Sequence, residues 1–265
     1  MIVLAVALEV NAIASRAQAP AGPTPESSAE QAPRKGLVAD IEAYYTAPLR
    51  WDGGQWLLFG GALGAVALAH NYDRQVRTHF VDNSSTALST KNEKDLEDWA
   101  PSVVLLGGTG LFALVADDRE SRSVTWAMAE AAGLSTVTGY VLKFAAGRER
   151  PDETTDPNRW REGGSSFPSE HAVAAFAIGT VFAESGNGGY RWLTRLVGYG
   201  MAAWTGYARL KHNSHWLSDV VAGAALGSST AAFVVNRNYG RHLFSGVTVV
   251  PIERGVLVTY STHLD

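Results

Sequence analysis

Three short stretches between residues 143 and 219 hold side chains that could bind and transfer a phosphoryl group together. The first runs from Lys143 to Pro151 (KFAAGRERP), the second is the tetrapeptide PSEH at 168–171, and the third runs from Ala208 to Asp219 (ARLKHNSHWLSD). Arginine and lysine hold phosphate oxygens through charge-assisted hydrogen bonds. Of two histidines in such a site, one can attack the phosphorus while the other protonates the leaving group.

Helix ends are the elements that must position these side chains. Lys143 falls near the end of an apolar, helical stretch that Gly147 is expected to terminate, and Arg150 follows in the loop. Ser169, Glu170 and His171 directly precede another apolar run, so they are expected at a helix N-terminus. Free backbone N–H groups and the helix dipole make such an end a ready site for an anion.

The third stretch combines a histidine with an acid. His215 and Asp219 are four residues apart on a predicted helix and therefore share one face. We expect Asp219 to accept a hydrogen bond from one ring nitrogen of His215. This bond would fix the tautomer and leave the other nitrogen free to attack, as in a catalytic triad.

The order and spacing of the three stretches resemble the signature of the type 2 phosphatidic acid phosphatase family. That signature reads K-x6-R-P, then P-S-G-H, then S-R-x5-H-x3-D, and the resemblance covers residues 120–236 or so. The family shares its fold and site with bacterial non-specific acid phosphatases and vanadium haloperoxidases. This chain departs from the signature twice, with Glu170 in place of the glycine and Ala208 in place of the serine.

The resemblance implies a role for each residue. His215 would be the nucleophile that forms a phosphohistidine, Asp219 would orient it, and His171 would protonate the leaving oxygen and later activate water. The phosphoryl oxygens would be held by five groups: Lys143, Arg150, Ser169, Arg209 and the backbone N–H of Glu170. The Glu170 side chain is then expected to point outward or to pair with an arginine. No metal or other cofactor is expected, and vanadate is expected to inhibit.

The composition and the apolar pattern predict an all-α domain over residues 36–241. Six apolar runs lack the alternation of strands: Trp56–Ala69, Val103–Ala116, Val124–Ala146, Ala172–Ala183, Trp192–Tyr207 and Trp216–Val235. A six-helix bundle of the type found in the phosphatase and haloperoxidase superfamily is the natural assembly. Residues 242–265 depart from this pattern, and Val247–Ile252 with Val256–Ser261 predict a short β-hairpin.

Residues 1–35 are expected to lie outside the folded domain. Apolar residues and two small-x-small sites in residues 1–19 are typical of a weak export signal, although Glu9 interrupts the run and no basic residue opens it. Residues 20–35 have the Pro, Ala, Ser and Glu content of a linker. The other histidines have no matching partners and are expected to be surface or capping residues: His70, His79, His212, His242 and His263.

Charge and hydropathy bear on the partners of the protein. The 265-residue chain has a formal net charge of −4 and no cysteine, so nothing indicates nucleic acid, disulfides or thiolate metal sites. The first two apolar runs are shorter than the 20 or so residues that a membrane span needs. We therefore favour a periplasmic or peripherally attached protein of a bacterial-type cell envelope, with an integral membrane protein as the alternative.

Together these features predict a metal-independent phosphatase for a phosphomonoester or diphosphate. A lipid phosphate is the favoured substrate and a small soluble phosphomonoester the variant, whereas the oligomeric state is not indicated. One rival is a vanadium-dependent haloperoxidase, in which vanadate would be the cofactor. The other is a non-catalytic envelope scaffold that acts through the hairpin.

Overall fold

A computed structural model describes residues 37–83, 91–186, 188–239, 247–252 and 255–260. The chain divides into two compact units, one of Met1–Gln55 with Phe244–Asp265 and one of Trp56–Leu243. The expected export signal and linker at residues 1–35 lie outside the described residues, as do His242 and His263.

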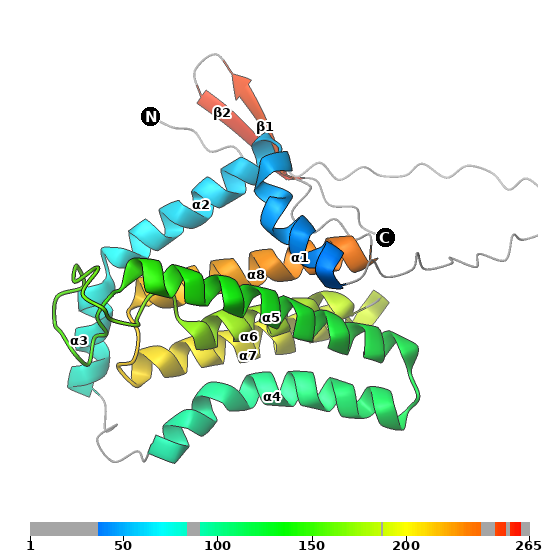
Figure 1. Cartoon of the computed structure of the whole chain (residues 1–265), viewed down its shortest axis with the longest axis horizontal. Coiled ribbons are helices and arrows are strands. Elements are labelled where there is room, and N and C mark those ends of the chain that lie inside the picture. The colour runs from blue at the N-terminus through cyan, green and yellow to red at the C-terminus, as the bar shows by residue number, and fades with distance from the viewer. Residues whose placement is uncertain (1–36, 84–90, 187, 240–246, 253–254, 261–265) are drawn as a thin grey trace, which may run out of the picture. The chain divides into compact units, whose positions relative to one another are not determined.

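The smaller unit contains helix α1 (Leu37–Thr46), a 3₁₀ turn (Ala47–Arg50) and two strands (Figure 1). Strands β1 (Val247–Ile252) and β2 (Gly255–Tyr260) pair antiparallel, with Val247 opposite Tyr260 and Ile252 opposite Gly255. The alternating pattern predicted strands over Val247–Ile252 and Val256–Ser261, and the second strand lies one residue earlier than expected. Pro251 is tolerated in β1 because a two-stranded sheet leaves one side of each strand unpaired.

The larger unit is helical, and each of the six apolar runs lies largely within a helix. Its described elements are α2 (Gly53–His70, whose first turn belongs to the smaller unit), α3 (Asp73–Asn83), α4 (Lys91–Val115), α5 (Arg119–Ala146), α6 (Glu170–Ser185), a 3₁₀ turn (Gly188–Tyr190), α7 (Arg191–Lys211) and α8 (Leu217–Tyr239). Helices α1 and α3 were not expected from the sequence.

Five of these helices, rather than the expected six, form the packed bundle. Helix α6 packs against α5, α7 and α8, and α4 lies against α5, α6 and α7 (Figure 1). The run in α2 predicted a sixth member, but Ala69 is the one buried residue that the structure gives this helix. Helix α3 contacts α7 and α8 instead. Uniform apolarity in α2 therefore marks an exposed helix and not a core helix.

Glycines bring the central helices close enough to align their ends. A Cβ on Gly179 of α6 would lie 2.5 Å from the Gly198 carbonyl of α7, and one on Gly227 of α8 would lie 2.3 Å from the Val173 carbonyl of α6. Neither position can hold a larger residue without separating the helices. This close packing brings the start of α6 next to the start of α8, where the Ser169 N–H donates to the Asp219 carbonyl at 3.1 Å.

Helix α5 has well-defined ends. The Asp118 carboxylate caps its first turn by accepting from the Ser121 N–H at 2.8 Å. Its other end closes at Gly147, as predicted, in the left-handed conformation (φ 52°) with its N–H donating to the Lys143 carbonyl. The chain can therefore turn sharply after Lys143 and carry the following arginines back across the end of the bundle.

Candidate active site

Lys143 reaches from the last turn of α5 to the loop before α6. Its ammonium donates to the carbonyls of Ser165 at 2.7 Å and Pro168 at 2.9 Å. Burial lowers the pKa of Lys143 to about 8, although the negative charge of Glu170 opposes the shift. The lysine thus ties together the first two sequence stretches and carries a charge that titrates near neutral pH.

Arg150 lies in the loop after α5, in a turn that fixes its backbone. Its N–H donates to the Glu153 carboxylate at 2.9 Å, and its carbonyl accepts from the Glu153 and Thr154 N–H groups. The next carbonyl, of Pro151, accepts from Arg77 at 2.9 Å and from Asn213 at 3.2 Å. The Nε atom of Arg150 is buried and has no hydrogen-bond partner within the described part of the chain.

The start of α6 presents a second donor without a partner. Ser169 occupies the N-cap position and is fully buried, but its side chain caps no backbone N–H. Its Oγ has no hydrogen-bond partner among residues 37–83, 91–186 and 188–239. Buried polar atoms are rarely left unpaired, so donors of this kind at a helix N-terminus fit an anionic ligand.

His171 lies in the first turn of α6, where positive charges surround it. Burial lowers its pKa to about 3, and the charges of Arg209, His215, Arg150 and Lys143 add to the shift in that order. The structure therefore brings together basic residues from all three sequence stretches around this ring. Trp99 of α4 packs against this ring, with its ring centroid 4.4 Å from that of His171.

His215 precedes α8 and is buried, with 4% of its surface exposed. Its Nδ1 lies 2.8 Å from the Ser166 carbonyl, which can only accept, so Nδ1 carries the proton. Its Nε2 has no partner among the residues that the structure describes and is left with its lone pair. Burial lowers the pKa of His215 to about 4, which keeps the ring neutral near pH 7.

Asp219 does not bond His215 directly, contrary to our expectation. Its nearer oxygen is 3.7 Å from Nδ1 of His215, which is too long for a hydrogen bond. The same oxygen accepts from the Ser166 hydroxyl at 2.5 Å and from the Trp216 N–H at 2.9 Å. Asp219 therefore acts on His215 largely through Ser166, whose hydroxyl binds the acid and whose carbonyl binds the ring.

Arg209 lies in the last turn of α7 and forms an ion pair with Asp98 of α4. Both side chains are buried. His212 was expected to be a surface or capping residue. It is the C-cap of α7, but its side chain is buried and lies 3.1 Å from Glu97 and 3.3 Å from Asp98. No sequence signal marked Glu97 and Asp98, because they precede the three stretches by more than forty residues.

Glu170 occupies neither of the two positions expected for it. Its carboxylate packs against α5, where a Cβ on Gly139 would lie 2.7 Å from one of its oxygens. Both oxygens are buried and have no hydrogen-bond partner in the described ranges. Burial raises the pKa of Glu170 to about 7, although the charge of Lys143 opposes the shift. The side chain turns inward because Gly139 leaves room for it.

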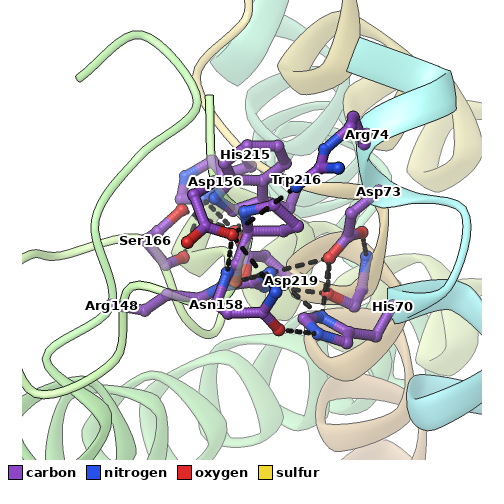
Figure 2. A network of polar contacts seen from close by, with 12 residues as sticks. His70, Asp73, Arg74, Arg148, Asp156, Asn158, Ser166, His215, Trp216 and Asp219 are labelled. Atoms are coloured by element: carbon purple, nitrogen blue, oxygen red, sulfur yellow. Dashed lines mark hydrogen bonds and ion pairs between the residues drawn. The ribbon is translucent and has the colours of Figure 1, made fainter. Parts of the chain in front are cut away.

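A buried network that the sequence did not suggest adjoins Asp219 (Figure 2). Arg148, with no exposed surface, donates to Asp219 at 2.5 Å and to Asp73 of α3 at 2.7 Å. Asp73 also accepts from the N–H and the hydroxyl of Ser218 at 2.8 and 2.6 Å. His70, expected on the surface or at a cap, lies 3.0 Å from Asp73.

Comparison with known proteins agrees with this arrangement. Residues 124–242 match the family model described as the PAP2 superfamily, and this segment contains most of α5, all of α6 to α8 and all eight candidate residues. The class defined by the three stretches is thus a helical phosphatase-type domain. Residues 124–242 belong to the PAP2 superfamily, the type 2 phosphatidic acid phosphatase family that the sequence resembles, and the resemblance is confirmed.

Two curated relatives share part of the chain. A lipid A 1-phosphatase of Porphyromonas gingivalis is 35% identical over 113 residues, which are 41% of this chain and 23% of that protein. A PA-phosphatase related-family protein of Dictyostelium discoideum is 32% identical over 130 residues, which are 43% of this chain and 48% of that protein. The chain thus spans less than half the length of either relative.

Among solved structures, the chain is similar to a transmembrane PAP2-type phosphatidylglycerolphosphate phosphatase from Bacillus subtilis. The TM-score is 0.45 at 18% identity, and the alignment covers 67% of this chain and 92% of that one.

Proposed function

We propose that this protein is a phosphatase that hydrolyses a phosphomonoester or diphosphate through a phosphohistidine. The observation that carries the proposal is a neutral His215 with its Nε2 lone pair available, set among the positive charges of Lys143, Arg150 and Arg209. A neutral imidazole is the nucleophilic form, and fixed cations stabilise the charge that develops on the transferring phosphoryl group.

The chemistry would proceed in two displacements. In the first, Nε2 of His215 forms a bond to phosphorus as the bond from phosphorus to the leaving oxygen breaks, and His171 gives that oxygen its proton. In the second, His171 takes a proton from water as the water oxygen attacks phosphorus and the bond to nitrogen breaks. Inorganic phosphate leaves, and both histidines return to their starting states. A bound phosphate dianion raises the pKa of His171, which offsets the effect of the surrounding cations.

Donors without partners supply the binding site for the phosphoryl oxygens in this proposal. The buried Ser169 hydroxyl and Arg150 Nε would donate to them, together with backbone N–H groups of the first turn of α6. Because these positive charges and dipoles do the electrostatic work, we propose that the reaction needs no divalent metal and that vanadate inhibits by occupying the same site.

A lipid phosphate is the proposed substrate class. The surface of the larger unit exposes many large apolar side chains on four helices, among them Leu63 of α2, Leu114 and Val115 of α4, Phe144 of α5 and Leu196 of α7. Exposed apolar surface on this scale is typical of a protein that contacts a membrane. Both curated relatives carry names of lipid-phosphate chemistry, which supports the same class.

The same surface supports attachment to a membrane. Two helical segments are long and apolar enough to cross a bilayer, Leu96–Val115 and Leu217–Arg237, with 28% and 61% of their most apolar windows buried. Burial within the bundle explains the apolarity of the second, whereas the first exposes most of its apolar residues. We therefore propose a membrane-bound protein of a cell envelope, with α2 and α4 against lipid.

A phosphate-release panel tests the proposal. The full chain in detergent micelles would be given phosphatidate, phosphatidylglycerolphosphate, lipid A and a soluble aryl phosphate, each with and without EDTA. We expect release from a lipid phosphate, persistence in EDTA and competitive inhibition by vanadate. Activity that needs an added divalent cation would refute the metal-free mechanism. Vanadate-dependent oxidation of bromide by peroxide, without phosphate release, would favour the haloperoxidase.

A further inference from the structure

Arg148 makes more hydrogen bonds in its buried network than it would need to neutralise Asp219 alone. Arg148 lies two residues before Arg150 and uses all five of its N–H groups. They reach Pro157, Ser218, Asp219 and Asp73 at distances of 2.5 to 3.1 Å. Its guanidinium also lies over the Trp160 ring, 4.4 Å from the centroid. A group held from so many directions has a single orientation.

The guanidinium is a bridge between two carboxylates from distant parts of the chain. Its Nη1 faces Asp219 of α8 and its Nη2 faces Asp73 of α3. All three side chains have no exposed surface. Since a buried ion is stable only when it is paired and fully hydrogen-bonded, each acid depends on the fork geometry of the arginine. Figure 2 shows these three side chains and His70 within one network of polar contacts.

Asp219 transmits this constraint to the candidate nucleophile. Its second oxygen accepts from the Ser166 hydroxyl, and the Ser166 carbonyl accepts from Nδ1 of His215. A displaced Asp219 would release Ser166, and with it the bond that fixes the tautomer of the His215 ring. The path from α3 to Nδ1 of the His215 ring therefore consists of hydrogen bonds of 2.5 to 2.8 Å, joined through the side chains of Arg148 and Asp219 and through Ser166.

We propose that Asp73 and Arg148 are positioning residues for phosphoryl transfer, which hold Asp219, and through Ser166 the His215 ring, in the attacking geometry. This inference rests on the proposed function in so far as it concerns turnover. It assigns to α3, a helix outside the segment that matches the family, a direct influence on the chemistry.

The first test compares two close substitutions with matched controls. Asp73→Asn keeps the shape of the side chain but turns an N–H donor toward Arg148, and Arg148→Lys keeps the charge but loses the fork. We expect kcat to fall about tenfold for Asp73→Asn and about a hundredfold for Arg148→Lys, with KM changed by less than about twofold. The controls are Glu162→Gln and Arg159→Lys, which alter the nearby, partly exposed ion pairs of Arg159 with Glu149 and Glu162, and their kcat should stay at the wild-type value.

The second test reads the ring itself and does not depend on turnover. In ¹⁵N-histidine spectra of the full chain, the His215 signals are identified by their loss in His215→Gln. Wild type should show protonation at Nδ1 alone, and Asp73→Asn should show a mixture of tautomers. If wild type releases no phosphate from any substrate, the proposed function fails, and this spectrum still decides the positioning role.

One further variant covers the case in which the buried substitutions prevent folding. Ser166→Ala removes the hydroxyl that binds Asp219 but keeps the backbone carbonyl that binds His215, and it adds no charge. We expect about a tenfold lower kcat and the same tautomer mixture. Wild-type kcat and a single Nδ1-protonated tautomer in Ser166→Ala, or in Asp73→Asn where that variant folds, would overturn the inference.

Discussion

Two arginines, Arg148 and Arg150, lie two residues apart in one loop and have opposite surroundings. Arg148 is fully buried, and each of its N–H groups has an acceptor within the protein. Arg150 is only half-buried, and its Nε has no acceptor in the described part of the chain. The first is satisfied without a ligand, whereas in the proposed function the second would gain its partner when an anion binds. Residue type alone does not separate a structural arginine from a ligand-binding one, but donor satisfaction does.

The largest expected effect falls on His215, the proposed nucleophile. His215→Gln keeps a polar side chain in the buried position but cannot form a phosphohistidine. We expect turnover to fall by at least about a thousandfold. Rapid acid quench with ³²P-labelled substrate should trap a phosphoenzyme in wild type and none in the variant. Label on Ser169, or near-normal turnover in His215→Gln, would contradict the assignment.

The contrast between the two arginines predicts that truncating Arg150 lowers activity and that truncating Arg148 lowers folding stability. Arg150→Ala should lower kcat/KM about a hundredfold, because a phosphate contact is lost, while the midpoint of thermal unfolding changes little. Arg148→Ala leaves Asp73 and Asp219 buried without their cation and should lower the free energy of unfolding by about 3–5 kcal/mol. Chemical denaturation and steady-state kinetics on both variants measure the two quantities. Equal destabilisation by the two variants would remove the distinction.

Lys143 should make catalysis at the proposed phosphate site depend on pH. Its pKa is lowered to about 8, so the ammonium is present below that pH and is lost as the pH rises through it. We expect kcat/KM, which reports the free enzyme, to fall on the alkaline side with an apparent pKa near 8. Lys143→Arg, which stays charged, should move this alkaline limb upward by at least one unit or so. An unchanged limb in the variant would assign it to another group.

The pH dependence of folding stability tests whether the Glu170 carboxylate packs inward at the start of α6. Its pKa is about 7 in the folded protein against 4.5 as the reference, so the folded state binds the extra proton between these values. Folding stability should therefore fall as the pH rises from about 4.5 to 7, and Glu170→Gln should remove this decline. Thermal unfolding at pH 5 and pH 7.5 gives the comparison. The catalytic efficiency of Glu170→Gln should differ from that of wild type by less than about tenfold.

The smallest expected effect concerns the glycine beneath that carboxylate. Gly139→Ala places a methyl group 2.7 Å from a Glu170 oxygen, so it should destabilise wild type by about 1 kcal/mol or more. The same substitution made in Glu170→Gly should be neutral or stabilising. A double-mutant cycle in urea measures the coupling, and additive effects would mean that the two residues do not meet.

Local features of the sequence predicted much of this structure. The end of α5 at Gly147, the start of α6 beside Ser169 and the helix carrying Asp219 all follow from local patterns, because capping and apolar period act over a few residues. The convergence of basic residues around His171 was predicted from spacing within one segment.

Long-range contacts could not be predicted in this way. Asp73 and Asp98 each pair with an arginine more than seventy residues away, and nothing in the spacing of single acids marks such pairs. The inward turn of Glu170 depends on a glycine in another helix, so it too was missed. The exposed surface of α2 was misread because apolarity without a polar face has the same pattern in a core helix and in one that meets lipid.

Asp73 also bears on what counts as a complete unit of this domain. The matched segment begins at residue 124 and retains every residue of the three stretches. A fragment cut at that boundary would lose the carboxylates of Asp73 and Asp98, and with them one of the two acids paired with Arg148 and the acid paired with Arg209. Such a fragment would carry the full motif but not all the ion pairs that hold its buried arginines. For this chain, a domain boundary drawn from the motif therefore leaves out residues that the candidate site needs to keep its buried ion pairs.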